Sequence, residues 1–492
     1  MATRRPRART VIAVVAAVVV LGVPGWLWWS SLLPSRYSVM DMGYVDTGGG
    51  PGVGGVAMAG MPGMAPGRSV TTLTDPSTAQ ADVRVTLVAR KERTRLASGQ
   101  EIDGYTLNGT SPGPQLTAVE GQLVEVRLQN ATVPAGVVLH WHGVEVPGAM
   151  DGTAGVTQDA VPPGGEFVYR FRATHAGTFW YHSHQVTHEQ VERGLFGALV
   201  VTPRTPAAGV DALALVHLYE GRRTVNGLAG DVPVTAPPGT PVRVRVVNTD
   251  AGPMRVWPTG GDFRVLAVDG REVHGPTPLR DTSVVVTAGG RADLEVLAPP
   301  PGGGVRVEIG GNSAVVLGTP PPPTPVPAAT VDMLTYGTPA PLGFDPAAPD
   351  RRFEYAIGRS FGFMDGVPGL WWTVNGHLYP DVPMYVVRAG DVVTMHVANS
   401  SGEVHPMHLH GHHAVVLARN GTPATGSPWW FDSLNVENGE SYDIAFVADN
   451  PGVWMDHCHQ LRHAADGLVA HLMYEGVDTP YLVGGPAGNS PE

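Results

Sequence analysis

Histidines in this chain are concentrated in pairs separated by a single residue. Random placement of the 19 histidines among 492 residues predicts about 0.7 such pairs, whereas the sequence contains five. The pairs are 140/142, 182/184, 408/410, 410/412 and 457/459. Residues two apart on a β-strand point to the same face, so each pair presents two imidazoles side by side. Four such pairs predict a cavity lined by eight imidazoles, which indicates a metal site.

The single cysteine, Cys458, lies between two of these histidines. Adjacent strand residues face opposite ways, so Cys458 can reach a different metal centre from His457 and His459. Together with His405 and His463 it offers one thiolate and two imidazoles, the ligand set that selects blue copper. A buried, inert thiol is the alternative, but it leaves the flanking imidazoles without a purpose.

Several nearby or isolated residues are not expected to bind metal. Leu468, the tenth residue after the cysteine, cannot ligate, and an axial position without a thioether should raise the potential of the copper. Lone histidines are more often satisfied by ordinary hydrogen bonds. We expect this of His217, His274, His377 and His396.

The elements that position these residues are predicted by an internal repeat. Three alternating segments end in Asn: LVEVRLQN from Leu123, VRVRVVN from Val242 and VVTMHVAN from Val392. A second set, PGGEFVYRF from Pro163, AGGRADLEV from Ala288 and ENGESYDIAF from Glu437, follows in the same order. Two motifs that recur three times predict three copies of one β domain, of the Greek-key sandwich type.

The first and third copies align directly around their histidines. GTFWYHSHQVTHEQVERGL from Gly177 matches GVWMDHCHQLRHAADGL from Gly452, with Ser183 in the place of Cys458. The middle copy has neither the histidine pairs nor the cysteine. It should therefore carry no copper.

These patterns divide the chain into five parts. We expect a membrane or signal segment over 1–33, a Met-, Gly- and Pro-rich tether over 34–80, and β domains over 81–205, 206–319 and 328–480. A proline run from Pro320 separates the last two. The tether is expected to be flexible, and its methionines, soft ligands for Cu(I), are Met40, Met42, Met58, Met61 and Met64.

The first 30 residues have the pattern of a membrane segment. Four arginines (Arg4, Arg5, Arg7 and Arg9) precede an apolar run from Val11 to Trp29 that ends in tryptophans. A cleaved signal peptide is the alternative, although no small-x-small cleavage site follows. Either way, the protein should lie outside the cytoplasm, anchored to the cell membrane or secreted.

The charge excludes one class of partner. The net charge is −12, and Lys91 is the only lysine. Without a basic face there is little to neutralise a phosphate backbone, so nucleic acid is not expected as a partner.

The motifs resemble those of the multicopper oxidases, in particular three-domain laccase-like members, over about residues 80–475. HWHG from His140, HSH from His182, HPMHLH from His405 and HCHQLRHAADGL from His457 occur in the family's order. The resemblance implies three cupredoxin-like domains and four copper ions. It assigns the type 1 copper to His405, Cys458 and His463, with Leu468 axial; the type 2 copper to His140 and His408; and the type 3 coppers to His142, His182 and His459 and to His184, His410 and His457.

The resemblance also suggests how protons reach oxygen. Asp151 matches an acid that supports proton delivery in bacterial relatives, although an Asp in a Gly-flanked turn is an alternative explanation. Some relatives carry Glu directly after the last type 1 histidine, where this chain has Ala464. Asp456 and Asp466 are nearby candidates for the second proton path.

The predicted activity is oxidation of a substrate at the type 1 site, with Cys458 passing single electrons through His457 and His459 to the three-copper cluster that reduces O2 to water. Phenols or aromatic amines are one substrate class, and Cu(I) delivered by the methionines is another. A non-enzymatic copper-binding scaffold and a copper nitrite reductase are the alternatives. About four copper ions per chain would support the oxidase, two the reductase, and one or none the scaffold.

Overall fold

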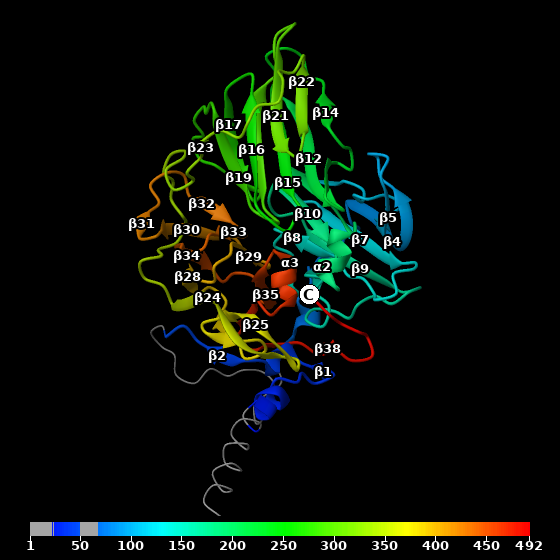
Figure 1. Cartoon of the computed structure of the whole chain (residues 1–492), viewed down its shortest axis with the longest axis vertical. Coiled ribbons are helices and arrows are strands. Elements are labelled where there is room, and N and C mark those ends of the chain that lie inside the picture. The colour runs from blue at the N-terminus through cyan, green and yellow to red at the C-terminus, as the bar shows by residue number, and fades with distance from the viewer. Residues whose placement is uncertain (1–21, 23, 50–66) are drawn as a thin grey trace, which may run out of the picture.

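The computed structural model describes residues 22, 24–49 and 67–492, and it consists mostly of β-strands (Figure 1). Six sheets of four or more strands enclose three main hydrophobic cores, so the described part of the molecule consists of three β-sandwiches. This confirms the prediction of an all-β chain. Among the described residues, no helix is long and apolar enough to cross a membrane.

The first sandwich spans residues 83–202. One sheet has the order β5 (Glu101–Leu107), β4 (Val83–Arg95), β7 (Leu123–Asn130), β9 (Glu166–Arg172). The other has the order β6 (Leu116–Val119), β11 (Phe196–Thr202), β10 (Gly177–His182), β8 (His140–His142). The short helix α2 (Thr187–Glu192) and the 3-10 turn η3 (Gly148–Met150) lie in its loops.

The second sandwich spans residues 210–330. Its first sheet is β13 (Arg222–Val225), β12 (Val210–Tyr219), β15 (Pro241–Asn248), β20 (Arg291–Leu297), β17 (Phe263–Val268), β18 (Arg271–Glu272). Its second sheet is β14 (Asp231–Val234), β22 (Ser313–Gly318), β21 (Gly304–Gly310), β16 (Met254–Thr259), β19 (Thr282–Val286), β23 (Ala329–Thr330). Figure 1 shows it as the green part of the molecule, at the top.

The third sandwich contains most of the chain after residue 350. One sheet is β2 (Tyr44–Asp46), β27 (Pro383–Val387), β36 (Val469–Tyr474), β35 (Val453–Cys458), β29 (His405–Leu409), β33 (Ser433–Val436). The other is β26 (His377–Leu378), β25 (Val367–Val374), β24 (Arg351–Met364), β28 (Val392–Asn399), β34 (Ser441–Val447), β30 (Ala414–Arg419), β31 (Thr422–Pro423), with β32 (Trp429–Phe431) paired to β30. Helix α3 (Leu461–Ala465) follows β35.

The repeat found in the sequence has one structural meaning in all three sandwiches. The Asn-ended strands are β7, β15 and β28, and each pairs antiparallel with the strand of the second motif, β9, β20 or β34. The terminal residues Asn130, Asn248 and Asn399 are buried, and each side-chain amide donates hydrogen bonds to loop carbonyls. The asparagine thus closes the same loop three times.

The segment expected to be a flexible tether differs from that prediction in its described parts. β1 (Arg36–Tyr37) pairs with β38 (Val483–Gly484), β2 joins the third sandwich beside β27, and β3 (Arg68–Ser69) pairs with β37 (Val477–Asp478). The 3-10 turns η1 (Val39–Asp41) and η2 (Val70–Thr72) bury Val39 and Val70. These contacts join residues about 300 or more apart, which sequence periodicity cannot reveal. Met58, Met61 and Met64 lie outside the described residues.

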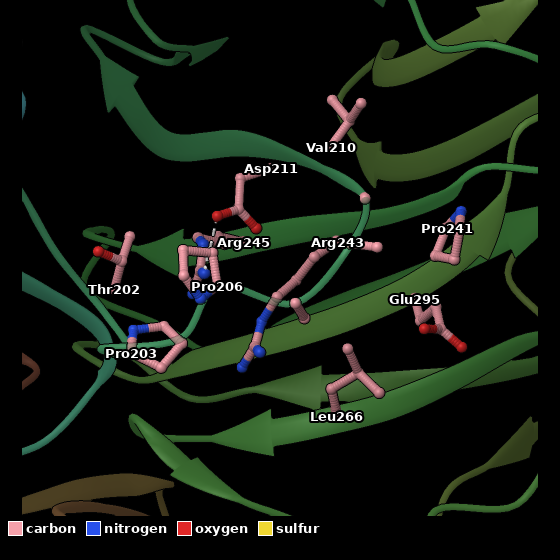
Figure 2. A pocket seen from close by; sticks show the side chains of 13 residues that line it. Thr202, Pro203, Pro206, Val210, Asp211, Pro241, Arg243, Arg245, Leu266 and Glu295 are labelled. Atoms are coloured by element: carbon pink, nitrogen blue, oxygen red, sulfur yellow. Dashed lines mark hydrogen bonds and ion pairs between the residues drawn. The ribbon is translucent and has the colours of Figure 1, made fainter. Parts of the chain in front are cut away.

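Charged side chains fasten the first sandwich to the second. A cavity of about 240 Å³ lies where the chain crosses between them, lined by Pro203, Asp211 and Arg245 among others (Figure 2). One Arg245 nitrogen lies 3.0 Å from the Asp211 carboxylate, and another donates to the Thr178 hydroxyl on β10 at 2.9 Å. No histidine lines this cavity, so we infer that its lining residues connect the two sandwiches.

Candidate metal centres

The histidine pairs lie on, or at the end of, two pairs of neighbouring strands, one in the first and one in the third sandwich; His184, His410 and His459 lie just after their strands. In the first sandwich β8 and β10 are adjacent, with His140 opposite His182. In the third, β29 and β35 are adjacent, with His408 opposite His457. Period-two alternation points each pair out of its own sandwich. The predicted cavity of eight imidazoles therefore exists, at the contact between the first and third sandwiches.

Within this cavity the imidazoles form compact groups whose ligand atoms lie within 4.8 Å of one another. The groups made of histidines alone are His140, His142 and His408; His142, His182 and His459; and His184, His410 and His457. The Nε2 atoms of His140 and His408 are 3.4 Å apart, and those of His410 and His457 are 3.1 Å apart. So many ring nitrogens at hydrogen-bond distance are typical of a shared cation.

The electrostatics of the cavity favour neutral imidazoles that bind metal. All eight side chains are buried. Burial, reinforced by neighbouring histidines, lowers the pKa of most of them well below the usual value; this holds for His142, His182, His184, His408, His410 and His459. Burial likewise lowers the pKa of His457 to about 3. A neutral imidazole keeps a nitrogen lone pair free for a metal.

Several ring nitrogens in the cavity are buried without a hydrogen-bond partner. They include His142 Nδ1, His182 Nε2 and both nitrogens of His459. An unpartnered buried polar atom costs about 1–3 kcal/mol. Imidazoles also suit copper among the divalent metals. The donor set and its unpartnered atoms therefore fit copper ions.

Asp151 supports the cavity from one side. Its carboxylate lies 3.2 Å from Nδ1 of His140 and 3.1 Å from Nδ1 of His410, and accepts a hydrogen bond from Thr153. Burial by itself raises the pKa of Asp151, but His140 and these hydrogen bonds outweigh it and hold the pKa below the usual value. With Nδ1 occupied, each ring turns Nε2 toward the other imidazoles.

Asp432 supports the opposite side, and sequence reasoning missed it. Its carboxylate lies 3.1 Å from Nε2 of His142, and its backbone carbonyl accepts from Nδ1 of His408 at 2.8 Å. The carboxylate is itself held by Arg291, whose Nη1 donates to Oδ1 at 2.6 Å. Both side chains are fully buried. Arg291 comes from β20, so the middle sandwich contributes to a site for which it supplies no histidine.

The loop before β20 also presses against the histidines. Gly289 has φ +77°, and a Cβ added there would lie 2.8 Å from Cε1 of His142 and 2.9 Å from the His459 ring. Its carbonyl accepts from Trp180 Nε1 at 3.0 Å. Gly289 belongs to AGGRADLEV, the middle copy of the repeated Gly turn. The repeated Gly turn was therefore visible in the sequence, but its contact with the histidines was not.

Cys458 and its two histidines form a separate group next to the cavity. Sγ lies 3.6 Å from Nδ1 of His405 and 3.8 Å from Nδ1 of His463, and these nitrogens are 3.2 Å apart. Burial raises the pKa of the Cys458 thiol in the absence of a cation, whereas a coordinated thiol is deprotonated. Leu468 is fully buried, and its carbonyl accepts from the Cys458 amide.

The outer edge of this group is covered by few side chains. The Trp372 ring lies 4.7 Å from the His405 ring and 4.4 Å from the His463 ring, centroid to centroid. The Arg359 guanidinium stacks on Trp372 at 3.9 Å. Glu403, whose side chain is 46% exposed, reaches within 3.4 Å of His463 Nε2. His463 is therefore the imidazole nearest to solvent.

Among the described residues, the side chains of Asp456 and Asp466, the sequence candidates for a second proton path, form no hydrogen bond or ion pair with the clustered histidines. Asp456 faces the core of the third sandwich, where burial raises its pKa to about 8, and Asp466 is exposed. The carboxyl group near the clustered histidines is instead that of Glu492, with Oε1 3.3 Å from Nδ1 of His457. Glu492 and Ala464 line one cavity of about 350 Å³. Glu492 follows Ala464 by 28 residues and His457 by 35, so no motif around these residues includes it.

The lone histidines behave as expected. His217 bonds to Thr249 and to the Glu192 carbonyl, His274 to the Thr338 carbonyl, and His377 and His396 to aspartates. None of them belongs to a metal-competent group among the described residues.

Two regions of the chain match family models described as multicopper oxidase, residues 88–206 and 354–476. They contain all the histidines of the four groups and Cys458. The chain belongs to the multicopper oxidase family.

Relatives of this multicopper oxidase match most of its length. Laccase-1 of Botryotinia fuckeliana is 29% identical over 452 residues, covering 77% of this chain and 79% of its own. The multicopper oxidase MmcO of Mycobacterium tuberculosis is 28% identical over 476 residues, covering 83% and 88%. The structure of a multi-copper oxidase from Pseudomonas thermotolerans, 26% identical, superposes with a TM-score of 0.67 over 80% of this chain and all of its own.

The multicopper oxidase is an oxidoreductase that uses copper, four ions in the family's standard complement, to oxidise a substrate and reduce dioxygen. The scaffold and nitrite reductase alternatives are not favoured.

Proposed function

We propose that this multicopper oxidase takes single electrons from phenols or aromatic amines at the Cys458 group and reduces dioxygen at the cavity of eight imidazoles. The observation that carries the proposal is the grouping of all ten histidines and Cys458 into ligand-sized sets. Copper, when bound, supplies reversible one-electron storage. The electron-entry and oxygen-reducing sites share one strand, because Cys458 is covalently joined to His457 and His459.

The proposed ligand sets follow the geometric groups. His405, Cys458 and His463 would hold the type 1 ion, with Leu468 at the position from which an axial thioether is missing, and His140 and His408 would hold the type 2 ion. The type 3 ions take His142, His182 and His459, and His184, His410 and His457. Asp151 orients His140 and His410 and would support proton delivery at this side of the cavity.

The edge of His463 beside Glu403, where the His463 side chain is 9% exposed, supports an aromatic substrate. Trp372 offers a flat ring beside the imidazole, and Glu403 offers a carboxylate that accepts a proton from a phenol or an aromatic ammonium. Oxidation of a phenol releases one proton with each electron, so a carboxylate at this edge assists the reaction. Cu(I) is the second candidate substrate, although Met42 is buried and Met40 packs against the core of the third sandwich.

Two further features of the sequence complete the proposal. The β domains extend over 81–205, 206–319 and 328–480, with copper bound by the first and third. The segment 1–33 anchors the protein to the cell membrane, with the oxidase outside the cytoplasm. Its support is the absence of any charged residue between Arg9 and Arg36.

The test is an oxygen-electrode assay of copper-loaded protein with a phenol and with Cu(I), beside Cys458→Ser. We expect about four copper ions in the parent, and loss of the blue colour and of oxygen uptake in the variant. Oxygen uptake retained by Cys458→Ser would contradict the electron route. Deletion of residues 40–67 separates the substrates, because unchanged Cu(I) turnover would exclude delivery by the methionines.

A further inference from the structure

Exposed large apolar side chains gather in one part of the surface. Of the 14 such side chains among the described residues, eight lie in two short segments, 26–32 and 361–370. They are Trp26, Leu27, Trp28, Trp29, Leu32, Phe361, Val367 and Leu370. Single exposed hydrophobic residues are ordinary, but such a concentration marks an interaction surface.

The two segments are fastened together although they are more than 300 residues apart. The amide of Asp365, at the turn between β24 and β25, donates to the Ser31 carbonyl at 3.0 Å, and its carboxylate accepts from the Leu33 amide at 3.1 Å. The Gly366 amide donates to the Ser31 hydroxyl at 3.1 Å. The tip of the hairpin is therefore held against the segment that contains the tryptophans.

The polar groups at the tip of the hairpin form hydrogen bonds with residues 31 and 33. Asp365 is the only charged residue between Arg359 and Asp381, and its carboxylate is bonded to the Leu33 amide. Gly366, with φ +74°, allows the turn to approach Trp28, because an added Cβ would lie 2.9 Å from the indole nitrogen. What remains exposed is apolar: Phe361 is 74% and Leu370 61% accessible.

From this arrangement we propose that the tip of the β24–β25 hairpin, residues 361–370, and the segment 26–32 form one surface that docks onto a lipid bilayer. A bilayer is the expected partner because segment 26–32 directly continues an uncharged apolar stretch that begins after four arginines. Tryptophans at the end of such a stretch are typical of the membrane interface. The inference extends the proposed membrane anchor and rests on it.

The same hairpin contains Arg359 and Trp372, which cover the proposed electron-entry site at His405 and His463. Arg359 is opposite Trp372 and Phe361 is opposite Leu370 in the ladder. Residues two apart share a face, so Phe361 and Leu370 lie on the face that covers His405 and His463, about 7 Å further along the strand. Docking would therefore hold the exposed edge of the oxidase toward the bilayer. An apolar donor dissolved in lipid would meet this edge first.

The test uses the full-length, copper-loaded protein with phosphatidylcholine vesicles. Cys458 is buried, so a new exposed cysteine can be labelled selectively with an environment-sensitive dye. Phe361→Cys and Leu370→Cys report on the hairpin, and Leu297→Cys, 52% exposed in the second sandwich, is the matched control. We expect a blue shift of the dye emission at 361 and 370 when the protein floats with vesicles, and none at 297.

The outcomes separate this inference from the anchor. Protein that floats with vesicles but shows no shift at 361 or 370 would overturn the docking surface and leave the anchor intact. Protein that does not float would overturn both, while its oxygen uptake would still report on the proposed oxidase. A shift that needs no vesicles and grows with protein concentration would assign the surface to a second copy and overturn the bilayer proposal.

Discussion

Substitution of Arg291 by Met tests whether the middle sandwich helps to assemble a copper site for which it supplies no ligand. Arg291 and Asp432 are fully buried and paired, so solvent does not screen them. Removing one partner of a buried pair costs about 3–5 kcal/mol, because the remaining charge is left uncompensated. The Asp432 carboxylate also contacts His142 at 3.1 Å. Loss of such a supporting contact typically weakens metal affinity by about 10–100-fold.

Arg306→Met is the matched control for this experiment. Arg306 is a buried arginine of the same sandwich, paired with Asp231 and Glu308 and not with any residue around the histidines. Denaturant unfolding should show that both variants are destabilised. Competition with a copper chelator should show weaker binding in Arg291→Met alone. The reasoning is refuted if Arg291→Met retains four copper ions with the affinity of the parent, or if Arg306→Met loses copper equally.

Three further substitutions probe other parts of the site. Gly289→Ala should lower copper content, since its Cβ meets His142 at 2.8 Å, whereas Gly302→Ala, with a similar positive φ and open space, should cost only the backbone strain, about 1 kcal/mol. Leu468→Met should lower the type 1 reduction potential in a redox titration, because a thioether becomes available; an unchanged potential would place Leu468 away from the axial position. Burial raises the pKa of Asp456 to about 8, so the folded protein keeps a proton that the unfolded chain releases above about pH 4. Stability should therefore fall as pH rises from 5 to 8, and Asp456→Asn should remove this slope in denaturant titrations.

The support of the copper cavity is shared among all three sandwiches. Asp151 belongs to the first, Arg291 and Gly289 to the second, and Asp432 to the third. The histidines of the first and third sandwiches can meet only when both sandwiches have folded. The middle sandwich is then held against the histidines by the buried Arg291–Asp432 ion pair and by Gly289, which has no room for a side chain. This gives the middle sandwich, which supplies no histidine to the cluster, a structural role in the oxidase.

The sequence by itself determined which histidines fall in pairs on one strand face, because strand periodicity is local. Two residues that are two apart on a strand share a face, so spacing predicted that each of the pairs at His140, His182, His408 and His457 acts together, whereas the division into ligand sets came from the family resemblance. The same alternation separated Cys458 from its neighbours. The three repeats were equally accessible, since each Asn-ended strand and each Gly turn follows local rules.

Only the tertiary structure decided which residues stand behind the ligands. Arg291 reaches Asp432 across 141 positions, and Glu492 reaches His457 across 35. The same holds for β2, which the sequence suggested was part of a flexible tether and which joins the third sandwich. A supporting contact requires only complementary charge and a small gap at the right place. It leaves no period in the sequence, because the packing of distant strands brings its partners together.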